Sequence, residues 1–322
     1  MTKRALRWLR IPAAALLLAG AIALAGPRRV WEALSGADPR WLLAGLACAV
    51  AANLVSALRW RALCDWLGMR IPARWAVAAY FQGVAVNALL PGAVVGGDLL
   101  RAWRLRSLGH PGFEAGLSVL LDRVSGLWML VVLGAVALAL GLRDAGAAAA
   151  VSIAGAWPSA MPIDPVRAAL LAAAALLALP WLALRLALRT PQRVVAGRLG
   201  RLGAALARRG LSGPYALQAA LSAAVQLLSA GALLCALRAL GAELPAWAVL
   251  AAAVPIFLMA TLPVSFGGWG TREAAAAIAL GALGTPSAVA VTGSLVYGVY
   301  ALVQALGGWM TGGTRGGAVE PR

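Results

Sequence analysis

Long apolar stretches, separated by short polar or basic segments, run along almost the whole chain. Six of them are close in length to a membrane-spanning helix, which needs about 20 residues to cross the ~30 Å hydrocarbon core of a bilayer. They cover residues 9–26, 41–58, 117–142, 166–188, 214–240 and 288–311. The pattern predicts an all-α, polytopic helical bundle that forms a single integral membrane domain over residues 1–322.

Two further apolar regions, 75–108 and 245–285, are interrupted near their middle by proline and glycine. Proline removes a helical N–H and glycine permits sharp turns, so each interruption predicts a broken helix. Irregular backbone at membrane depth is tolerated only where protein or water covers it. We therefore expect two re-entrant hairpins. The Ala-rich segment 145–158 fits either an interfacial or a membrane-embedded position.

The two interruptions resemble each other. Each contains Leu-Pro, a short spacer and Gly-Gly, and each is followed by a charged pair. The turn residues are Pro91, Gly96 and Gly97 in the first region and Pro263, Gly267, Gly268 and Gly270 in the second. The flanking spans are predicted to cross the membrane in opposite directions. This indicates inverted-repeat units at 41–142 and 214–311, joined by 143–213, as in many secondary transporters.

Charged residues near the interruptions are the candidate substrate-binding groups, because a charge inside a membrane is costly and usually functional. They are Asp98, Arg101, Asp122, Arg123, Arg272 and Glu273. Asn87 and Ser265 lie beside the turns and suit either a ligand or the freed backbone of the broken helices. A structural alternative is also open, since Asp98 and Arg101 are spaced for an ion pair along a helix surface.

The composition supports the membrane interpretation. The chain is 62% hydrophobic and 12% charged, so it has too few polar residues to cover the surface of a water-soluble fold. Its net charge of +17 does not indicate nucleic acid, because the basic residues lie in short clusters between apolar runs. The positive-inside rule then places most of them, and both termini, on the cytoplasmic side of a bacterial inner membrane. The basic segment 189–212 fits a helix lying on the anionic inner leaflet.

The sequence offers little for catalysis. Its three cysteines have no paired spacing, and no Cys/His cluster indicates a metal site. No set of nucleophile, base and acid stands out, so we expect no enzyme activity, no metal and no cofactor. The polar residues Gln218, Gln226 and Gln304 are expected to join helices by hydrogen bonds, as such side chains often do in lipid.

Several motifs together resemble the flippase-like membrane-domain family, the transmembrane region of bacterial lysylphosphatidylglycerol synthases. They are Arg59-Trp60, the Asn87 to Arg101 stretch with Gly-Gly-Asp-x-x-Arg, the Ser118 to Arg123 stretch, and the Leu262 to Glu273 turn. Many relatives have Glu where this chain has Asp122. The synthases carry a soluble aminoacyl-transferase domain after the membrane part, whereas this chain stops at Arg322. We therefore expect a stand-alone member.

The resemblance implies movement of a lipid between leaflets: a phospholipid, an aminoacylated lipid, or a polyprenyl-linked or glycosylated lipid. In this hypothesis Arg101, Arg123 and Arg272 attract the headgroup phosphate, and the neighbouring acids tune or release it. Two alternatives stay open. One is a non-catalytic membrane partner of a glycosyltransferase or another lipid-pathway enzyme, and the other is a membrane enzyme acting on a lipid-linked substrate. The expected partners are membrane lipids, with a homo-oligomer also open.

Overall fold

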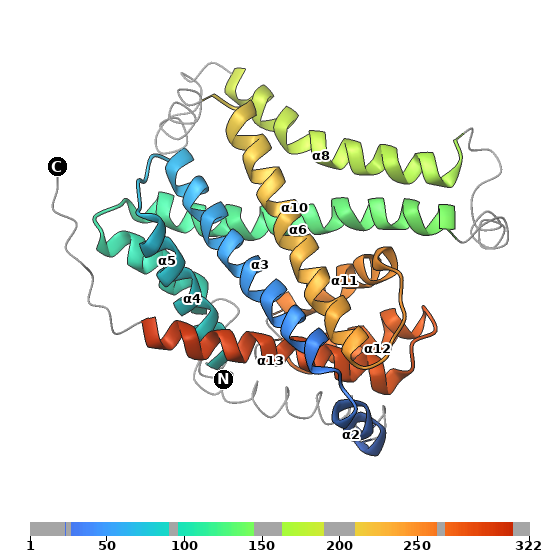
Figure 1. Cartoon of the computed structure of the whole chain (residues 1–322). Helices are drawn as coiled ribbons and strands as arrows, with labels where there is room; N and C mark the ends of the chain where they lie inside the picture. Colours follow the sequence, from blue (N-terminus) through green and yellow to red (C-terminus); the bar gives the residue numbers. More distant parts are fainter. Residues whose placement is uncertain are drawn as a thin grey trace, which may run out of the picture.

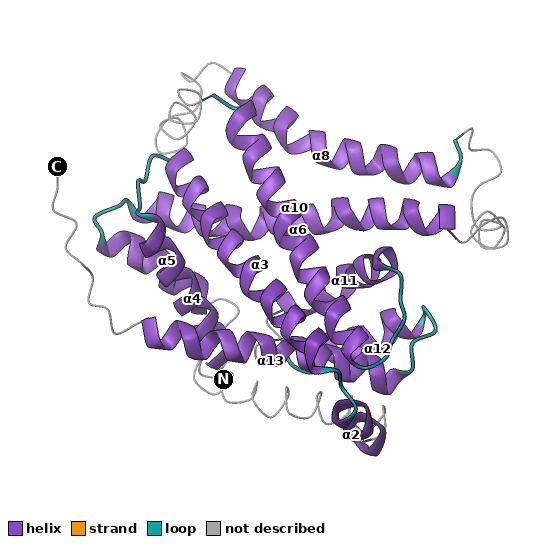
Figure 2. Cartoon of the chain, in the orientation of Figure 1, coloured by secondary structure: helices purple, strands orange, loops and turns teal. Residues whose placement is uncertain are grey.

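The computed structural model describes residue 23 and residues 27–89, 96–144, 163–189, 210–262 and 268–311. These residues form helices joined by short loops, and the described ranges contain no strand (Figure 2). The helices are α2 (Pro27–Ser35), α3 (Pro39–Trp66), α4 (Ala73–Leu89), α5 (Gly96–Ser107), α6 (Gly112–Asp144), α8 (Pro165–Arg189), α10 (Ser212–Ala239), α11 (Ala246–Thr261), α12 (Thr271–Gly281) and α13 (Ser287–Thr311). The all-α prediction is confirmed.

Five of these helices, α3, α6, α8, α10 and α13, are long and apolar enough to cross a membrane. They coincide with five predicted spans, which confirms a multi-pass membrane protein. The predicted first span, 9–26, lies outside the described residues apart from Ala23. The segment 145–158 and nearly all of 189–212 also lie outside them.

Helix α3 is longer than predicted. It begins where Asp38 caps it by accepting the N–H of Arg40 at 2.8 Å, and it continues to Trp66 because its last turns pack into a buried core. Arg59 and Trp60, expected to follow the span, are therefore buried inside the helix. The Arg59 guanidinium finds its ion-pair partner, Asp122, within the bundle.

Helices α3 and α10 form the central antiparallel pair (Figure 1). The Asp38 N–H donates to the Ala239 carbonyl at 2.8 Å at one end, and the Gln218 side chain donates to the Arg59 carbonyl at 3.1 Å near the other. Small buried residues let the two backbones approach closely. They are Ala49, Ala232 and Ala236.

The glutamines cross-link helices as predicted. Besides Gln218, the Gln226 Nε2 of α10 donates to the Gly126 carbonyl of α6 at 2.8 Å. The Asn53 Nδ2 of α3 donates to Gln304 Oε1 of α13 at 2.7 Å. Each bond satisfies a polar group that lipid could not, so these side chains fix neighbouring helices in place.

Each interrupted region contains two separate helices, as its proline and glycine predict. In the first, Asn87 Oδ1 accepts the Gly97 N–H at 2.8 Å near the turn, and Arg104 lies 5.9 Å from the Trp75 ring farther away. The contacts thus run in opposite directions along α4 and α5, which form an antiparallel hairpin. In the second region α11 packs against α12. Return to the same membrane face stays a prediction for both.

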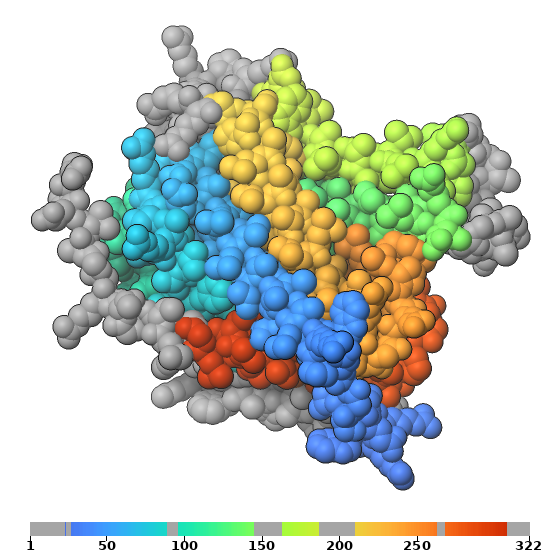
Figure 3. Space-filling model, viewed as in Figure 1, coloured from blue at the N-terminus to red at the C-terminus, as the bar shows by residue number. Residues whose placement is uncertain are grey.

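The helix contacts between the two predicted repeat units follow a matching pattern. Helix α4 packs on α13 while α11 packs on α6, and α5 packs on α6 while α12 packs on α13. An inverted repeat produces such correspondence, and the repeat itself stays a prediction. Helix α8 has no counterpart in this scheme: it packs mainly on α6 and lies at the edge of the molecule (Figure 3).

Candidate functional site

A cavity of about 300 Å³ lies between helices of the first predicted repeat unit and helices of the second. Its described lining comes from α3, α4, α5 and α6 on one side, and from α11, the turn before α12, α12 and α13 on the other. Candidate site residues from both units line it, namely Asn87, Asp98, Arg101, Arg123 and Arg272. The fold therefore brings together side chains that lie far apart in the sequence.

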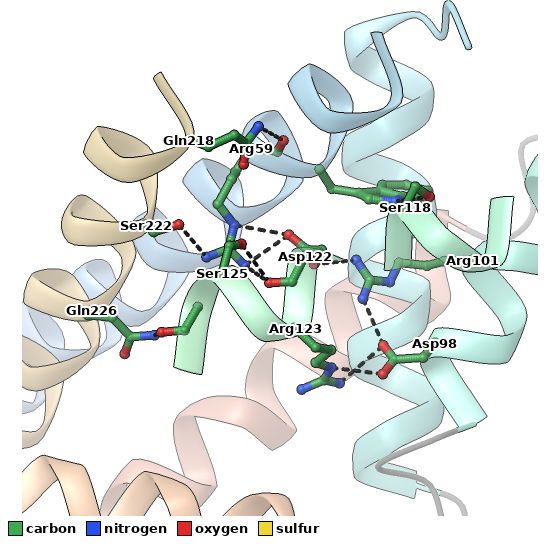
Figure 4. Close-up of polar contacts among 12 residues, drawn as sticks. Arg59, Asp98, Arg101, Ser118, Asp122, Arg123, Ser125, Gln218, Ser222 and Gln226 are labelled. Carbon is green, nitrogen blue, oxygen red and sulfur yellow. Dashed lines mark hydrogen bonds and ion pairs between the residues drawn. The ribbon is translucent and has the colours of Figure 1, made fainter. Parts of the chain in front are cut away.

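Three arginines and two aspartates form one continuous network beside this cavity (Figure 4). Asp122 lies between Arg59, whose Nε donates to Oδ1 at 3.0 Å, and Arg101, whose Nη1 donates to Oδ2 at 2.9 Å. Asp98 accepts from Arg101 Nη2 at 2.7 Å and from Arg123 Nε at 2.8 Å. Positive and negative charges therefore alternate along the network. It runs from Arg59 on α3 to Asp122 on α6, then to Arg101 and Asp98 on α5, and ends at Arg123 on α6.

The side chains at one end of the network are buried, and those at the other end are more exposed to solvent. Arg59, Arg101 and Asp122 are buried, whereas the side chains of Arg123 and Asp98 are 37% and 19% exposed. Burying an ion costs several kcal/mol unless it is paired, so the alternation makes the buried end tolerable. These five residues carry one net positive charge, and their most exposed cation, Arg123, lies at the cavity.

Aromatic rings fix the direction of Arg101. Its guanidinium carbon lies 4.6 Å from the Tyr80 ring centroid and 5.1 Å from that of Trp60. Trp60 is held in turn by its Nε1, which donates to Ser118 Oγ at 3.2 Å. Cation–π contacts of this kind strengthen when desolvated, so Arg101 is oriented before any ligand arrives.

The second charged pair is compact. Arg272 Nη2 donates to Glu273 Oε1 at 2.7 Å, and Ser294 Oγ donates to the same oxygen at 3.0 Å. Glu273 Oε2 accepts the Gly270 N–H at 2.5 Å, which satisfies the first turn of α12 in the manner of a capping box. The guanidinium carbon of Arg272 lies 5.1 Å from the centroid of the Trp269 ring. Glu273 is completely buried and therefore positions Arg272, which reaches the cavity.

The described turn glycines are required for different reasons. A Cβ on Gly97 would overlap the Gly83 carbonyl oxygen, because α4 and α5 touch there through backbone. Gly268 and Gly270 instead adopt φ values of 82° and 85°, which favour glycine. Gly96 begins α5. The other predicted turn and site residues, Pro91, Pro263, Ser265 and Gly267, lie outside the described residues.

Asn87 makes the backbone contact that the sequence suggested, since its side chain accepts the Gly97 N–H, and it also lines the cavity, where a ligand role stays a prediction. Sequence reasoning did not place Arg59 in the charged network, nor did it find the aromatic groups beside the arginines, Tyr80, Trp269 and Tyr297. A signal for Arg59 was present: buried apolar residues continue past it at helical spacing, at Leu63, Cys64 and Leu67.

The cavity therefore offers guanidinium groups and aromatic faces to a ligand. Within the described ranges, no group of three His, Cys, Asp or Glu side chains is placed to hold a metal ion. Guanidinium groups bind planar oxyanions, phosphate in particular, through paired N–H donors. The arrangement suits recognition of a phosphate-bearing group.

Long apolar helices around a buried ionic network and a cavity define a multi-pass integral membrane protein. Comparison with protein families finds a match to the family described as lysylphosphatidylglycerol synthase TM region over residues 9–308. The chain belongs to this family of membrane domains linked to lipid pathways, which confirms the resemblance seen in its motifs. No curated protein matches the chain.

Proposed function

We propose that this protein is a lipid transporter that passes a phosphate-bearing headgroup between the leaflets through the cavity. The observation that carries the proposal is the convergence of Arg101, Arg123 and Arg272, from both predicted units, on one cavity. A headgroup phosphate needs replacement for its hydration inside a membrane, and guanidinium groups supply it in bidentate form. Membership of a family linked to lipid pathways supports the same reading.

The size of the cavity favours a headgroup over a whole lipid. A volume of about 300 Å³ lies at the lower end of the ~300–1,000 Å³ of pockets that hold small-molecule ligands. In this proposal the acyl or polyprenyl chains stay in the bilayer while the polar group crosses. The substrate class is a phospholipid, an aminoacylated lipid, or a polyprenyl-linked or glycosylated lipid, and the protein acts without chemical conversion.

The acidic residues have separate parts in this mechanism. Asp98 pairs with both Arg101 and Arg123, so an arriving phosphate competes with it for the more exposed Arg123. Re-formation of the Asp98 pairs then helps release the headgroup. Glu273 is fully satisfied by Arg272, Ser294 and the α12 backbone and serves to hold Arg272.

The proposal places the protein in the bacterial inner membrane, with both termini and residues 189–212 in the cytoplasm. This orientation follows from the distribution of basic residues. With the first repeat unit starting inward and the second starting outward, the cavity would be served from both leaflets by equivalent elements.

The decisive test is leaflet exchange of labelled phospholipid in proteoliposomes of the purified protein. We expect Arg272→Ala to lose nearly all exchange and Arg272→Lys to keep part of it, because lysine retains the charge but not the planar fork. Arg167→Ala is the matched control, since this arginine is also paired with a carboxylate but is 81% exposed and is not one of the described residues that line the cavity. Monodisperse Arg272→Ala protein with the parental rate would refute the proposal and favour a non-catalytic partner of a lipid-pathway enzyme.

A further inference from the structure

A second cavity, of about 310 Å³, lies between α8 and the neighbouring helices α3, α6 and α10. It shares no described lining residue with the headgroup cavity. Its wall is almost entirely apolar and includes Leu63 and Trp66 of α3, Leu67 directly after it, Leu121 and Val124 of α6, and Leu184 of α8.

The cavity adjoins the proline in α8. Pro180 has no N–H, so the Leu176 carbonyl loses its partner within the helix. The Trp128 Nε1 of α6 donates to this carbonyl at 2.8 Å, and the Tyr215 hydroxyl of α10 donates to the carbonyl of Leu177. These bonds pin α8 to its neighbours beside the proline, and α8 changes direction along its length (Figure 1). The space on the cavity side is thus built by specific contacts.

Neither a void nor water accounts well for this space. Protein interiors leave few holes larger than one water molecule, and a buried water needs two to four polar partners. The polar atoms of the wall are either engaged inside the protein or buried behind the wall. Trp128 donates to α8, Ser125 donates to a carbonyl of its own helix, and Ser222 accepts from a buried arginine. Trp66 Nε1 and Gln218 Oε1 have no partner among the described residues, but both atoms are shielded from the cavity. The wall therefore presents hydrocarbon to its contents.

We propose that one acyl chain of a phospholipid from the surrounding bilayer occupies this cavity. The lining continues onto the outer surface of the bundle at Val124, which is 49% exposed, so a chain can enter from the membrane. Trp66, the last residue of α3, has an indole N–H without a partner among the described residues. That N–H is buried behind the wall, so the cavity presents no polar anchor and suits the hydrocarbon part of a lipid.

The acyl chain would also protect the ionic network. Gln218 and Ser222 belong to the cavity wall and both bond Arg59, through its carbonyl and its guanidinium. Hydrocarbon in the cavity keeps water away from the Arg59–Asp122 pair and so maintains the low dielectric in which that pair is strong. This role is independent of transport through the other cavity.

Tryptophan quenching by bromine on the acyl chain tests the proposal. The protein is placed in nanodiscs of phospholipid brominated near the middle of its chains, and the emission of Trp66 is obtained by subtracting that of Trp66→Phe. We expect Trp66 to lose most of its emission although it is buried from the protein surface. Ala219→Phe, which fills the cavity, should restore that emission. The matched control Ala220→Phe, on the exposed side of the same helix, should not.

A second filling variant, Val124→Phe, narrows the mouth of the cavity and gives the answer if Ala219→Phe does not elute as a monodisperse protein. We expect it to restore the emission of Trp66 as well. Unquenched Trp66 in the parent, or quenching that persists in every folded filling variant, would overturn the proposal. Leaflet exchange is measured separately, so failure here leaves the transport proposal untouched.

Discussion

The two charged clusters beside the cavity that Arg101, Arg123 and Arg272 line are built on different plans. In the first unit, three arginines and two aspartates connect α3, α5 and α6 across long sequence separations. In the second, Arg272 pairs with its own neighbour Glu273, and Ser294 of α13 and the Gly270 backbone join them. The first cluster therefore fastens helices to one another, whereas the second orients a single guanidinium.

This difference separates stability from ligand contact. Arg101 cannot be removed without leaving Asp122 and Asp98 short of a partner in a buried setting. Arg272 has one carboxylate partner, whose second oxygen keeps its backbone bond at Gly270 when the guanidinium is lost. Substitutions in the second cluster should thus report on function, and those in the first on folding.

The largest effect is expected at Asp122. Asp122→Ala leaves Arg59 and Arg101 buried without their shared carboxylate, and breaking a buried pair costs about 3–5 kcal/mol. Glu273→Gln removes one charge but keeps an oxygen to accept from Arg272 and Ser294. We expect a much larger drop in melting temperature in detergent for Asp122→Ala, or no folded protein at all. Equal melting temperatures would show that the two clusters do not differ as described.

The turn glycines sharpen the comparison. Gly97→Leu drives a side chain into the α4 backbone, so we expect loss of leaflet exchange together with lower thermal stability. Gly268→Ala meets only the cost of a positive φ and a close Ala260, about 1–2 kcal/mol, and should be milder. Gly116→Leu is the control, because that glycine lies on α6 with no atom within 4 Å of an added Cβ. Parental activity and stability of Gly97→Leu would contradict the tight α4–α5 contact.

The smallest perturbation tests the opposite directions of the units. With the three native cysteines replaced by alanine, single cysteines are placed at Arg70, just after α3, and at Glu243, just after α10. Both positions are exposed. A membrane-impermeant maleimide added to intact cells should label Glu243→Cys and spare Arg70→Cys until the membrane is permeabilised. The reverse pattern would invert the topology, and labelling of both would remove the proposed orientation of the units.

The sequence predicted the spans well because their ends are marked locally. Apolar runs begin at Pro39 and Pro165, which suit the first turn of a helix, and another ends before Gly241, so five predicted spans agree with helices in the structure. The two helix breaks were visible for the same reason. The local pairs Asp98–Arg101 and Arg272–Glu273 were visible as well, because their members are close in sequence.

The rest depended on contacts that no local pattern contains. Arg59 meets Asp122 from 63 positions away, and a basic residue after an apolar run is ordinarily topogenic. Its burial follows from the crossing of α3 and α6, which periodicity does not encode. The aromatic setting of Arg101 likewise joins α3, α4 and α5 and emerges only when these helices pack.

The alternating network also has a mechanical meaning. Helices α3, α5 and α6 are tied by ion pairs whose rupture would expose unpaired charge to hydrocarbon, so they should move as one rigid body. The α11 to α13 group packs on this block where α11 meets α6, and the cavity lies beside that contact with Arg123 and Arg272 on its two sides. In the proposed transport, a movement of one body against the other would therefore change the distance between these two guanidinium groups and so the width of the site.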